Sequence, residues 1–190
     1  MRKERFEAFT DAVLAIILTI LVLDIKLPSN SGSFSSLVEV VPKFIAYVVT
    51  FIFIATIWVN HHFLFSQVSK INNKILWVNI LALFWTSLLP ATTAWLGDHI
   101  MSPTPAVLYS LNVLLFNVTM LTLRSLVINE NKLTKHIGLS THEFISLIIN
   151  TATLVIAFWY PPFSFIGLSI DLIIWISLQF FHQDSRNTVH

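Results

Sequence analysis

The 190-residue chain is 55% hydrophobic and only 11% charged, which excludes an ordinary soluble domain, since such domains carry about a quarter charged residues. A net charge of +1 gives no positive field for nucleic acid, so we expect no nucleic-acid partner. Cysteine is absent, which excludes a disulfide framework, a cysteine-ligated metal and a cysteine nucleophile. The composition therefore indicates a membrane protein.

Six apolar segments follow one another along the chain, and each has roughly the 20 residues that a helix needs to cross the hydrocarbon core. They run near residues 6–27, 36–59, 73–96, 104–128, 140–160 and 162–182. The short connections contain turn-forming residues, although Pro161 and Pro162 could instead kink one long last segment. We therefore predict an all-α polytopic membrane protein with six transmembrane helices, formed by residues 1–190 as a single domain.

The Lys and Arg residues predict the orientation of these helices, because cytoplasmic loops carry an excess of them. With a cytoplasmic N-terminus, the inner side holds Arg2, Lys3, Arg5, Lys70, Lys74, Arg124, Lys132, Lys135 and Arg186. The outer side then holds only Lys26 and Lys43. We therefore expect both termini in the cytoplasm. Acidic residues at the start of the first segment, and no clear cleavage site after it, favour a retained span over a signal peptide.

The first segment separates into two faces when it is drawn as a helix at about 100° per residue. One narrow stripe contains Arg5, Phe9, Ala12, Ile16, Thr19 and Leu23, with Ile20 at its edge. Thr10 and Asp11 point away from it. The stripe is typical of a packing seam between helices, but it also fits a pore face with a hydrophobic constriction and a cation-binding hydroxyl at Thr19. Asp11 either caps the helix among the headgroups or faces protein or water.

Other polar residues give weaker indications. Trp58 and His61 are either interfacial anchors or hydrogen-bonding partners for Thr10 and Asp11, and the third segment contributes Asn79. Asp171, in the sixth segment, is costly in lipid and is a candidate for a second functional site. The adjacent histidines at 61 and 62 point different ways on a helix, and no complete catalytic motif is present. We expect no enzyme activity, no cofactor and no metal site.

The residues at the start of the first segment together resemble the signature of a known protein family. Arg5-x-x-x-Phe9-Thr10-Asp11 resembles the R-x-x-x-F-S-D signature of the transmembrane-protein-175 family, with threonine in place of serine. This family comprises the lysosomal potassium channel of animals and its bacterial homologues. The likeness continues through Trp58-x-x-His61 with Phe63, and then through Asn79 and Leu88-Leu89-Pro90. It covers about the first half of the chain.

The resemblance implies a fold and an assembly. A chain with one six-helix unit is similar to the bacterial members, which assemble as homotetramers with the first helix lining a central pore. By position, Ile16 would form the main hydrophobic constriction, Thr19 the hydroxyl layer linked to potassium preference, and Ile20 and Leu23 further constrictions toward the outside. Arg5, Phe9, Thr10 and Asp11 would form an interhelical network near the cytoplasmic mouth. Its implied partners are Trp58, His61 and Asn79.

These observations predict a potassium-permeable cation channel in a bacterial plasma membrane, with potassium ions and the lipid bilayer as its partners. It would have a hydrophobic constriction and no Thr-Val-Gly-Tyr-Gly filter, because no such sequence occurs in the chain. The alternative is a secondary transporter, proton-coupled through Asp11, His61 or Asp171. A membrane enzyme or a structural subunit ranks last, since no nucleophile–base constellation is present.

Overall fold

The computed structural model describes residues 2–29, 33–133 and 141–187, without the side chains of 141 and 178–187. Every regular element in this part of the chain is helical. The elements are α1 (Lys3–Leu23), α2 (Phe34–Leu37), the short 3-10 helix η1 (Val38–Val40), α3 (Val41–Ser66), α4 (Asn73–Ser87), α5 (Leu89–Asp98), α6 (Pro103–Asn131), α7 (Thr141–Ala157) and α8 (Phe163–Asn187). The predicted all-α fold class is confirmed.

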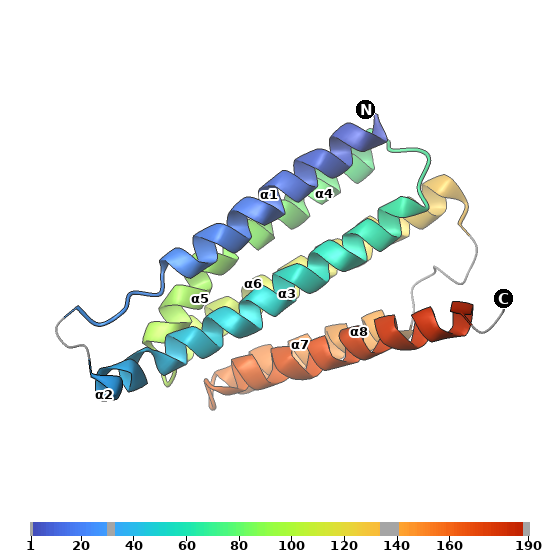
Figure 1. Ribbon diagram of the computed structural model, residues 1–190. Helices are drawn as coiled ribbons and strands as arrows, with labels where there is room; N and C mark the ends of the chain where they lie inside the picture. Colours follow the sequence, from blue (N-terminus) through green and yellow to red (C-terminus); the bar gives the residue numbers. More distant parts are fainter. Residues whose placement is uncertain (1, 30–32, 134–140, 188–190) are drawn as a thin grey trace.

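The long helices run beside one another along a common direction (Figure 1). Helix α1 packs against α3, α4 and α5, and α6 packs against α4, α5 and α7. Helices α7 and α8 form a pair that contacts α6 and α3 on the other side of the bundle. The start of α1 and the last turns of α8 lie at the same end, which we call the inner end. Helix α1 therefore occupies an edge of the bundle.

Four helical segments within the described residues are long and apolar enough to cross a membrane, which agrees with a polytopic membrane protein. They are Lys3–Leu23, Phe34–Ser66, Asn73–Asp98 and Pro103–Asn131. Two shorter apolar helices, His142–Ala157 and Phe163–Ser177, follow them. The expected fifth and sixth segments, 140–160 and 162–182, extend in part beyond what the structure describes.

The helix boundaries differ from the expected spans at several ends, for local reasons. Helix α1 ends at Leu23 rather than 27, ahead of Pro28, and α3 continues to Ser66 rather than 59. The third segment is divided at Leu88, because Pro90 cannot donate a backbone hydrogen bond and instead occupies the first turn of α5. Residues 158–162, with their two prolines, separate α7 from α8, so the last two segments are two helices.

Charged and polar contacts hold the helices together toward the end of the bundle opposite the start of α1, which we call the outer end. At the outer end, Lys43 of α3 forms an ion pair with Asp98 of α5, with Nζ and Oδ1 2.5 Å apart. One helical turn or more toward the interior, the Thr50 hydroxyl lies 3.0 Å from Thr93 Oγ1 and 2.9 Å from Tyr109 Oη, which joins α3, α5 and α6. The basic residues that the sequence placed inside lie toward the inner end, except that Lys135 and the Arg186 side chain are outside the described residues.

Helices α7 and α8 approach closely at Gly167. A Cβ atom at this position would lie 1.9 Å from Thr153 Oγ1 and 2.8 Å from Thr153 Cβ, so Thr153 or one of the two helices would have to shift to admit it. The absence of a side chain on α8 therefore permits the α7–α8 contact, as small residues do at many membrane helix interfaces.

Candidate functional site

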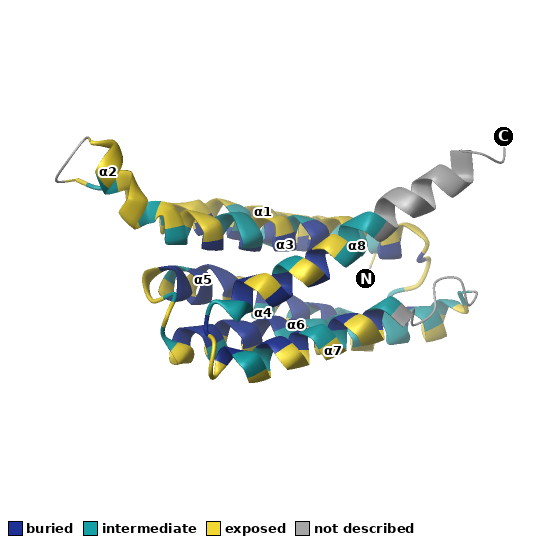
Figure 2. Cartoon of the chain, turned by 90° about the horizontal axis from the view of Figure 1, so that it is seen from below, coloured by how far each residue is buried: buried dark blue, intermediate teal, exposed yellow. Residues whose placement is uncertain are grey.

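Helix α1 has one buried face and one uncovered face. Phe6, Leu14, Ile17 and Leu21 are buried against the rest of the chain, at the three- and four-residue spacing of one helical side. The residues of the predicted pore stripe lie on the opposite side and are exposed (Figure 2). Ile16 is 58% exposed and Leu23 is 73% exposed. The packing seam of α1 within the chain is therefore the other face, and the stripe is left for lipid, a second copy or a pore.

The stripe has a defined order along α1. Ile16 lies roughly 20 Å from the inner end of the helix and roughly 10 Å from its outer end, at 1.5 Å per residue. Thr19 follows one turn further out, and its hydroxyl donates to the Ile16 carbonyl oxygen at 2.7 Å. Because the hydroxyl proton points at the backbone, the lone pairs of Thr19 Oγ1 remain available on the exposed side. Ile20 and Leu23 continue the apolar surface outward.

A directional chain of hydrogen bonds joins α1 to its neighbours near the inner end. Thr10, 1% exposed, donates to the Phe6 carbonyl oxygen at 3.2 Å and accepts from Asn79 Nδ2 at 2.9 Å. The Asn79 Oδ1 atom lies 3.0 Å from His61 Nε2, so it accepts the ring N–H of the Nε2-protonated tautomer. The His61 ring stacks on Phe65, with centroids 4.4 Å apart. Three helices, α1, α3 and α4, thus share one buried polar cluster.

Asp11 has a separate partner. Trp58 Nε1 of α3 donates to Asp11 Oδ1 at 2.9 Å, at an exposed position. The structure therefore brings together five of the seven residues of the expected network, in two groups. Arg5 and Phe9 lie on the uncovered face of α1, and within the described residues Arg5 makes no hydrogen bond or ion pair.

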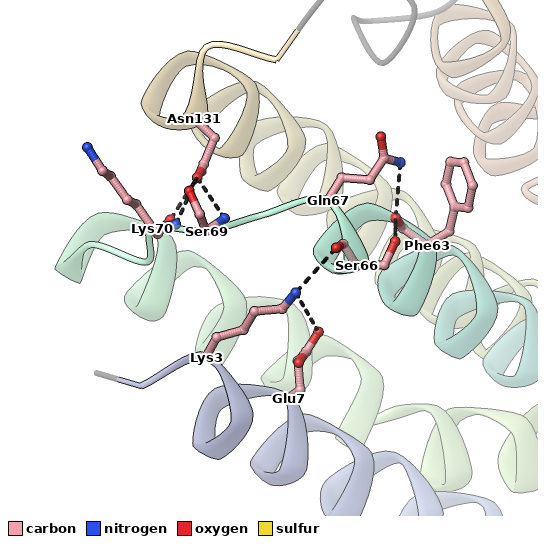
Figure 3. Close-up of polar contacts among 8 residues, drawn as sticks. All are labelled: Lys3, Glu7, Phe63, Ser66, Gln67, Ser69, Lys70 and Asn131. Atoms are coloured by element: carbon pink, nitrogen blue, oxygen red, sulfur yellow. Dashed lines mark hydrogen bonds and ion pairs between the residues drawn. The ribbon is translucent and has the colours of Figure 1, made fainter.

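The inner end carries contacts that the sequence analysis missed (Figure 3). Asn131, the last residue of α6, accepts from the backbone N–H of Ser69 at 3.1 Å and of Lys70 at 2.8 Å, and donates to the Lys70 carbonyl oxygen at 3.1 Å. Lys3 of α1 donates to the carbonyl oxygen of Ser66 at 3.4 Å. The α3–α4 connection is therefore fastened to α6 on one side and touched by the start of the first helix on the other.

A second polar cluster lies between α6, α7 and α8. Asp171 of α8 accepts hydrogen bonds from Ser146 Oγ and from Asn150 Nδ2, the latter at 2.8 Å. Arg124 of α6 forms an ion pair with Glu143 of α7, with Nε and Oε1 2.8 Å apart. Asp171 thus has its own partners on α7, away from those of Asp11 and His61. Among the described residues, no group of three or more His, Cys, Asp or Glu side chains is placed to hold a metal ion.

The chain is similar in sequence to a known family and to several known channels. The family described as the endosomal/lysosomal potassium channel TMEM175 matches residues 5–90. A potassium channel of Chryseobacterium sp. (strain P1-3) is 37% identical over 180 residues, which cover 93% of this chain and 93% of that protein. The mouse endosomal/lysosomal proton channel TMEM175 is 38% identical over 101 residues, which cover 47% of this chain and 20% of the mouse protein.

The fold has a solved counterpart as well. The crystal structure of a lysosomal potassium-selective channel TMEM175 homolog from Chamaesiphon minutus superposes with a TM-score of 0.83 over 92% of this chain and 96% of that one, at 24% identity. The match at 37% identity extends over almost the whole of both chains, and it includes the second half, in which the sequence analysis found no motif. The chain therefore belongs to the TMEM175 family.

Proposed function

We propose that this protein is a potassium-permeable channel of the bacterial plasma membrane, built from four copies whose α1 helices surround the pore. Relatives that match this chain carry the name potassium channel, and one of them matches it over almost its full length. In this proposal Ile16 forms the main constriction, Ile20 and Leu23 form further apolar rings, and Thr19 supplies oxygen to the ion. Residues 1–190 act as one membrane domain.

The observation that carries the proposal is the uncovered face of α1. This helix buries one side against its own chain and leaves the stripe from Arg5 to Leu23 without a partner in the described residues. Between Asp11 and Asp24 the stripe holds no charged residue, so it offers no fixed charge at which a transported ion would be trapped. An apolar surface with one hydroxyl layer suits a pore that conducts ions when water fills its lumen and closes when water leaves it.

The mechanism follows from the order of these side chains. Where four Ile16 side chains approach one another, water leaves the lumen, and an ion would have to shed its hydration against apolar walls. A small rotation or tilt of α1 would move these side chains apart and admit a hydrated or partly hydrated ion. The exposed lone pairs of Thr19 and the pore diameter would then set a modest preference among cations, without a ring of backbone carbonyls.

The proposal is tested by cation flux from the purified protein in liposomes under opposed potassium and sodium gradients. We expect flux driven by the potassium gradient, which does not saturate as a carrier would. Native mass spectrometry of the same preparation is expected to give the mass of four chains. Substrate-dependent, saturating flux would instead support a transporter, and a monomer that conducts would contradict the shared pore.

The role of Thr19 predicts a selectivity effect. Thr19→Val keeps the shape of the side chain but removes its oxygen, so we expect the permeability ratio of potassium to sodium to fall by about 2- to 10-fold, as loss of one polar contact would give. Reversal potentials in bilayers measure it. Thr122→Val is the matched control, because Thr122 is also exposed and donates to a carbonyl of its own helix, at 2.9 Å. Equal permeability ratios of potassium to sodium for wild type and Thr19→Val would show that Thr19 does not contact the permeating ion.

A further inference from the structure

A cavity of about 70 Å³ lies between α3, α6, α7 and α8, with largely apolar walls into which a few polar side chains are set, and none of its lining residues belongs to α1. A water molecule needs about 10–15 Å³ of such space, so the cavity has room for several waters, or for an ion with part of its hydration shell. The polar residues that line it include Asn60, Asn117, Arg124, Glu143 and Asp171. This cavity is separate from the proposed pore face of α1 and has no part in the proposed conduction of ions.

The charges that the described residues bring to the cavity do not balance. Arg124 and Glu143 neutralise each other as an ion pair whose side chains are 15% and 9% exposed. Asp171 is 3% exposed, and its two hydrogen-bond donors, the Ser146 hydroxyl and the Asn150 amide, are both neutral. Among the described lining residues, α3 contributes no titratable group, α6 contributes only Arg124, and α7 only Glu143. Within the described residues, the Asp171 carboxylate therefore has no cationic partner.

Supporting hydrogen bonds hold that carboxylate in place. Trp175 Nε1 donates to Ser146 Oγ at 2.7 Å, and Ser146 in turn donates to Asp171 Oδ1. Asn150 Nδ2 donates both to Asp171 Oδ2 and to the Ser146 carbonyl oxygen, each at 2.8 Å. The carboxylate is thus oriented by neighbours on both α7 and α8. These hydrogen bonds orient the carboxylate, but none of them brings a positive charge to it.

The Asp171 carboxylate lies deep in the bundle, where a charge without a partner is costly. Glu143 lies in the first turn of α7, near the inner end, whereas Ser146 and Asn150 lie about one and two turns further into the bundle. A buried carboxylate in a membrane helix is strongly unfavourable unless it is paired with a positive charge. The cavity beside Asp171 provides space for such a charge, and it is also lined by Asn117 and by Thr56 and Asn60 of α3. One uncompensated carboxylate matches one positive charge rather than a divalent ion.

We propose that Asp171 and this cavity bind a small monovalent cation in each chain, away from the pore. An alkali cation and a proton meet the same requirement, since either neutralises the carboxylate. Binding of an alkali cation depends on which salt is present, whereas binding of a proton depends on pH, so an experiment can distinguish the two. Occupancy of this site stabilises the packing of α7 and α8 on α3 and α6.

The test measures the thermal unfolding of the purified full chain in detergent. Potassium chloride, sodium chloride and N-methyl-D-glucamine chloride are compared at equal ionic strength, each at pH 6 and pH 8. If an alkali cation is bound, we expect potassium or sodium to raise Tm by about 3–6 °C over the large organic cation at roughly tenfold saturation. The rise is expected to disappear in Asp171→Asn. It should persist in Thr19→Val and in Asp98→Asn, a matched carboxylate change at the outer end.

A proton in the site gives a different pattern. Tm would then be independent of the alkali cation and higher at pH 6 than at pH 8, and this difference would be lost in Asp171→Asn. Equal responses of wild type and Asp171→Asn in every condition would overturn the proposal. If Asp171→Asn does not fold, infrared spectra of the wild type decide. The site is supported by a protonated carboxyl band, or by carboxylate bands that shift when potassium replaces the organic cation. Spectra that show neither of these signals would overturn the proposal. Ser146→Ala, which keeps the charge, should weaken the response.

Discussion

Ile16→Asn is expected to raise potassium flux through the protein on the order of tenfold, which corresponds to about 1.4 kcal/mol removed from the barrier. The side chain is 58% exposed on the uncovered face of α1, so the substitution creates no buried polar group within the chain. An amide at the proposed constriction retains water where isoleucine excludes it, and the ion then keeps more of its hydration. Potassium-driven flux in liposomes and the fraction of time that single channels are open measure the change.

Two controls separate a constriction from a general effect of polar residues on α1. Ile16→Leu keeps an apolar side chain of the same size and should leave flux near the wild-type level. Val22→Asn places the same amide about 120° around the helix from Ile16, at another exposed position. We expect no increase from it. Equal increases from Ile16→Asn and Val22→Asn, or wild-type flux from both, would contradict the assignment of Ile16.

The absence of cysteine allows a direct map of the same face. Single substitutions Thr19→Cys and Leu23→Cys would place thiols on the stripe, and Val22→Cys would place one beside it. Charged thiol reagents are expected to reduce flux through the first two proteins and to leave the third unaffected, because only water-exposed thiols form the reactive thiolate. No background modification arises from the wild-type chain.

Much of the architecture was accessible from the sequence, for a physical reason. A helix that crosses a bilayer needs an uninterrupted apolar stretch, so the length of the apolar segments and the positions of proline nearly fix the helices. The stripe on the first segment followed from helical geometry alone, and the structure leaves the same stripe uncovered. The residue-by-residue roles on that stripe stay predictions, as does the assembly of four chains.

What the sequence did not yield depends on register between helices far apart along the chain. Arg124 was counted only as an inner-side cation, and Glu143 was not singled out, yet the two form an ion pair that is largely shielded from solvent. Asn131 had no feature that distinguishes it, although it binds the α3–α4 connection. Such pairs arise from the packing of α6 against α4 and α7, and no local pattern encodes which turns of two helices meet. An alignment of relatives would be one source of that information.

The cluster around Asn79 gives the largest expected effect on stability. Asn79 uses both ends of its amide, donating to Thr10 on α1 and accepting from His61 on α3. Asn79→Leu keeps a similar volume but removes both interactions and leaves the ring N–H of His61 buried without an acceptor. We expect a loss of about 2–4 kcal/mol in the free energy of unfolding, as an orphaned buried group and two lost hydrogen bonds would give. Chemical unfolding in mixed micelles measures it.

Trp58→Phe is the matched comparison, because it removes a second hydrogen bond between side chains of α1 and α3. That bond lies at an exposed position, where water or a headgroup can replace the indole as the partner of Asp11. The expected loss is therefore about 1 kcal/mol or less. If Trp58→Phe destabilises the protein as much as Asn79→Leu does, burial is not what gives the cluster its strength.

A double-mutant cycle then isolates the contact that holds the proposed pore helix. Thr10→Val removes the hydroxyl that accepts from Asn79, so the two substitutions together should cost less than the sum of the separate costs. Interhelical hydrogen bonds in membrane proteins give coupling energies of about 0.6 kcal/mol on average and at most about 1.7. A value in that range would show that Thr10 and Asn79 stabilise the protein through each other. Since Thr10 lies only about 9 Å along α1 from Ile16, the same contact then fixes the position of the constriction relative to α3 and α4.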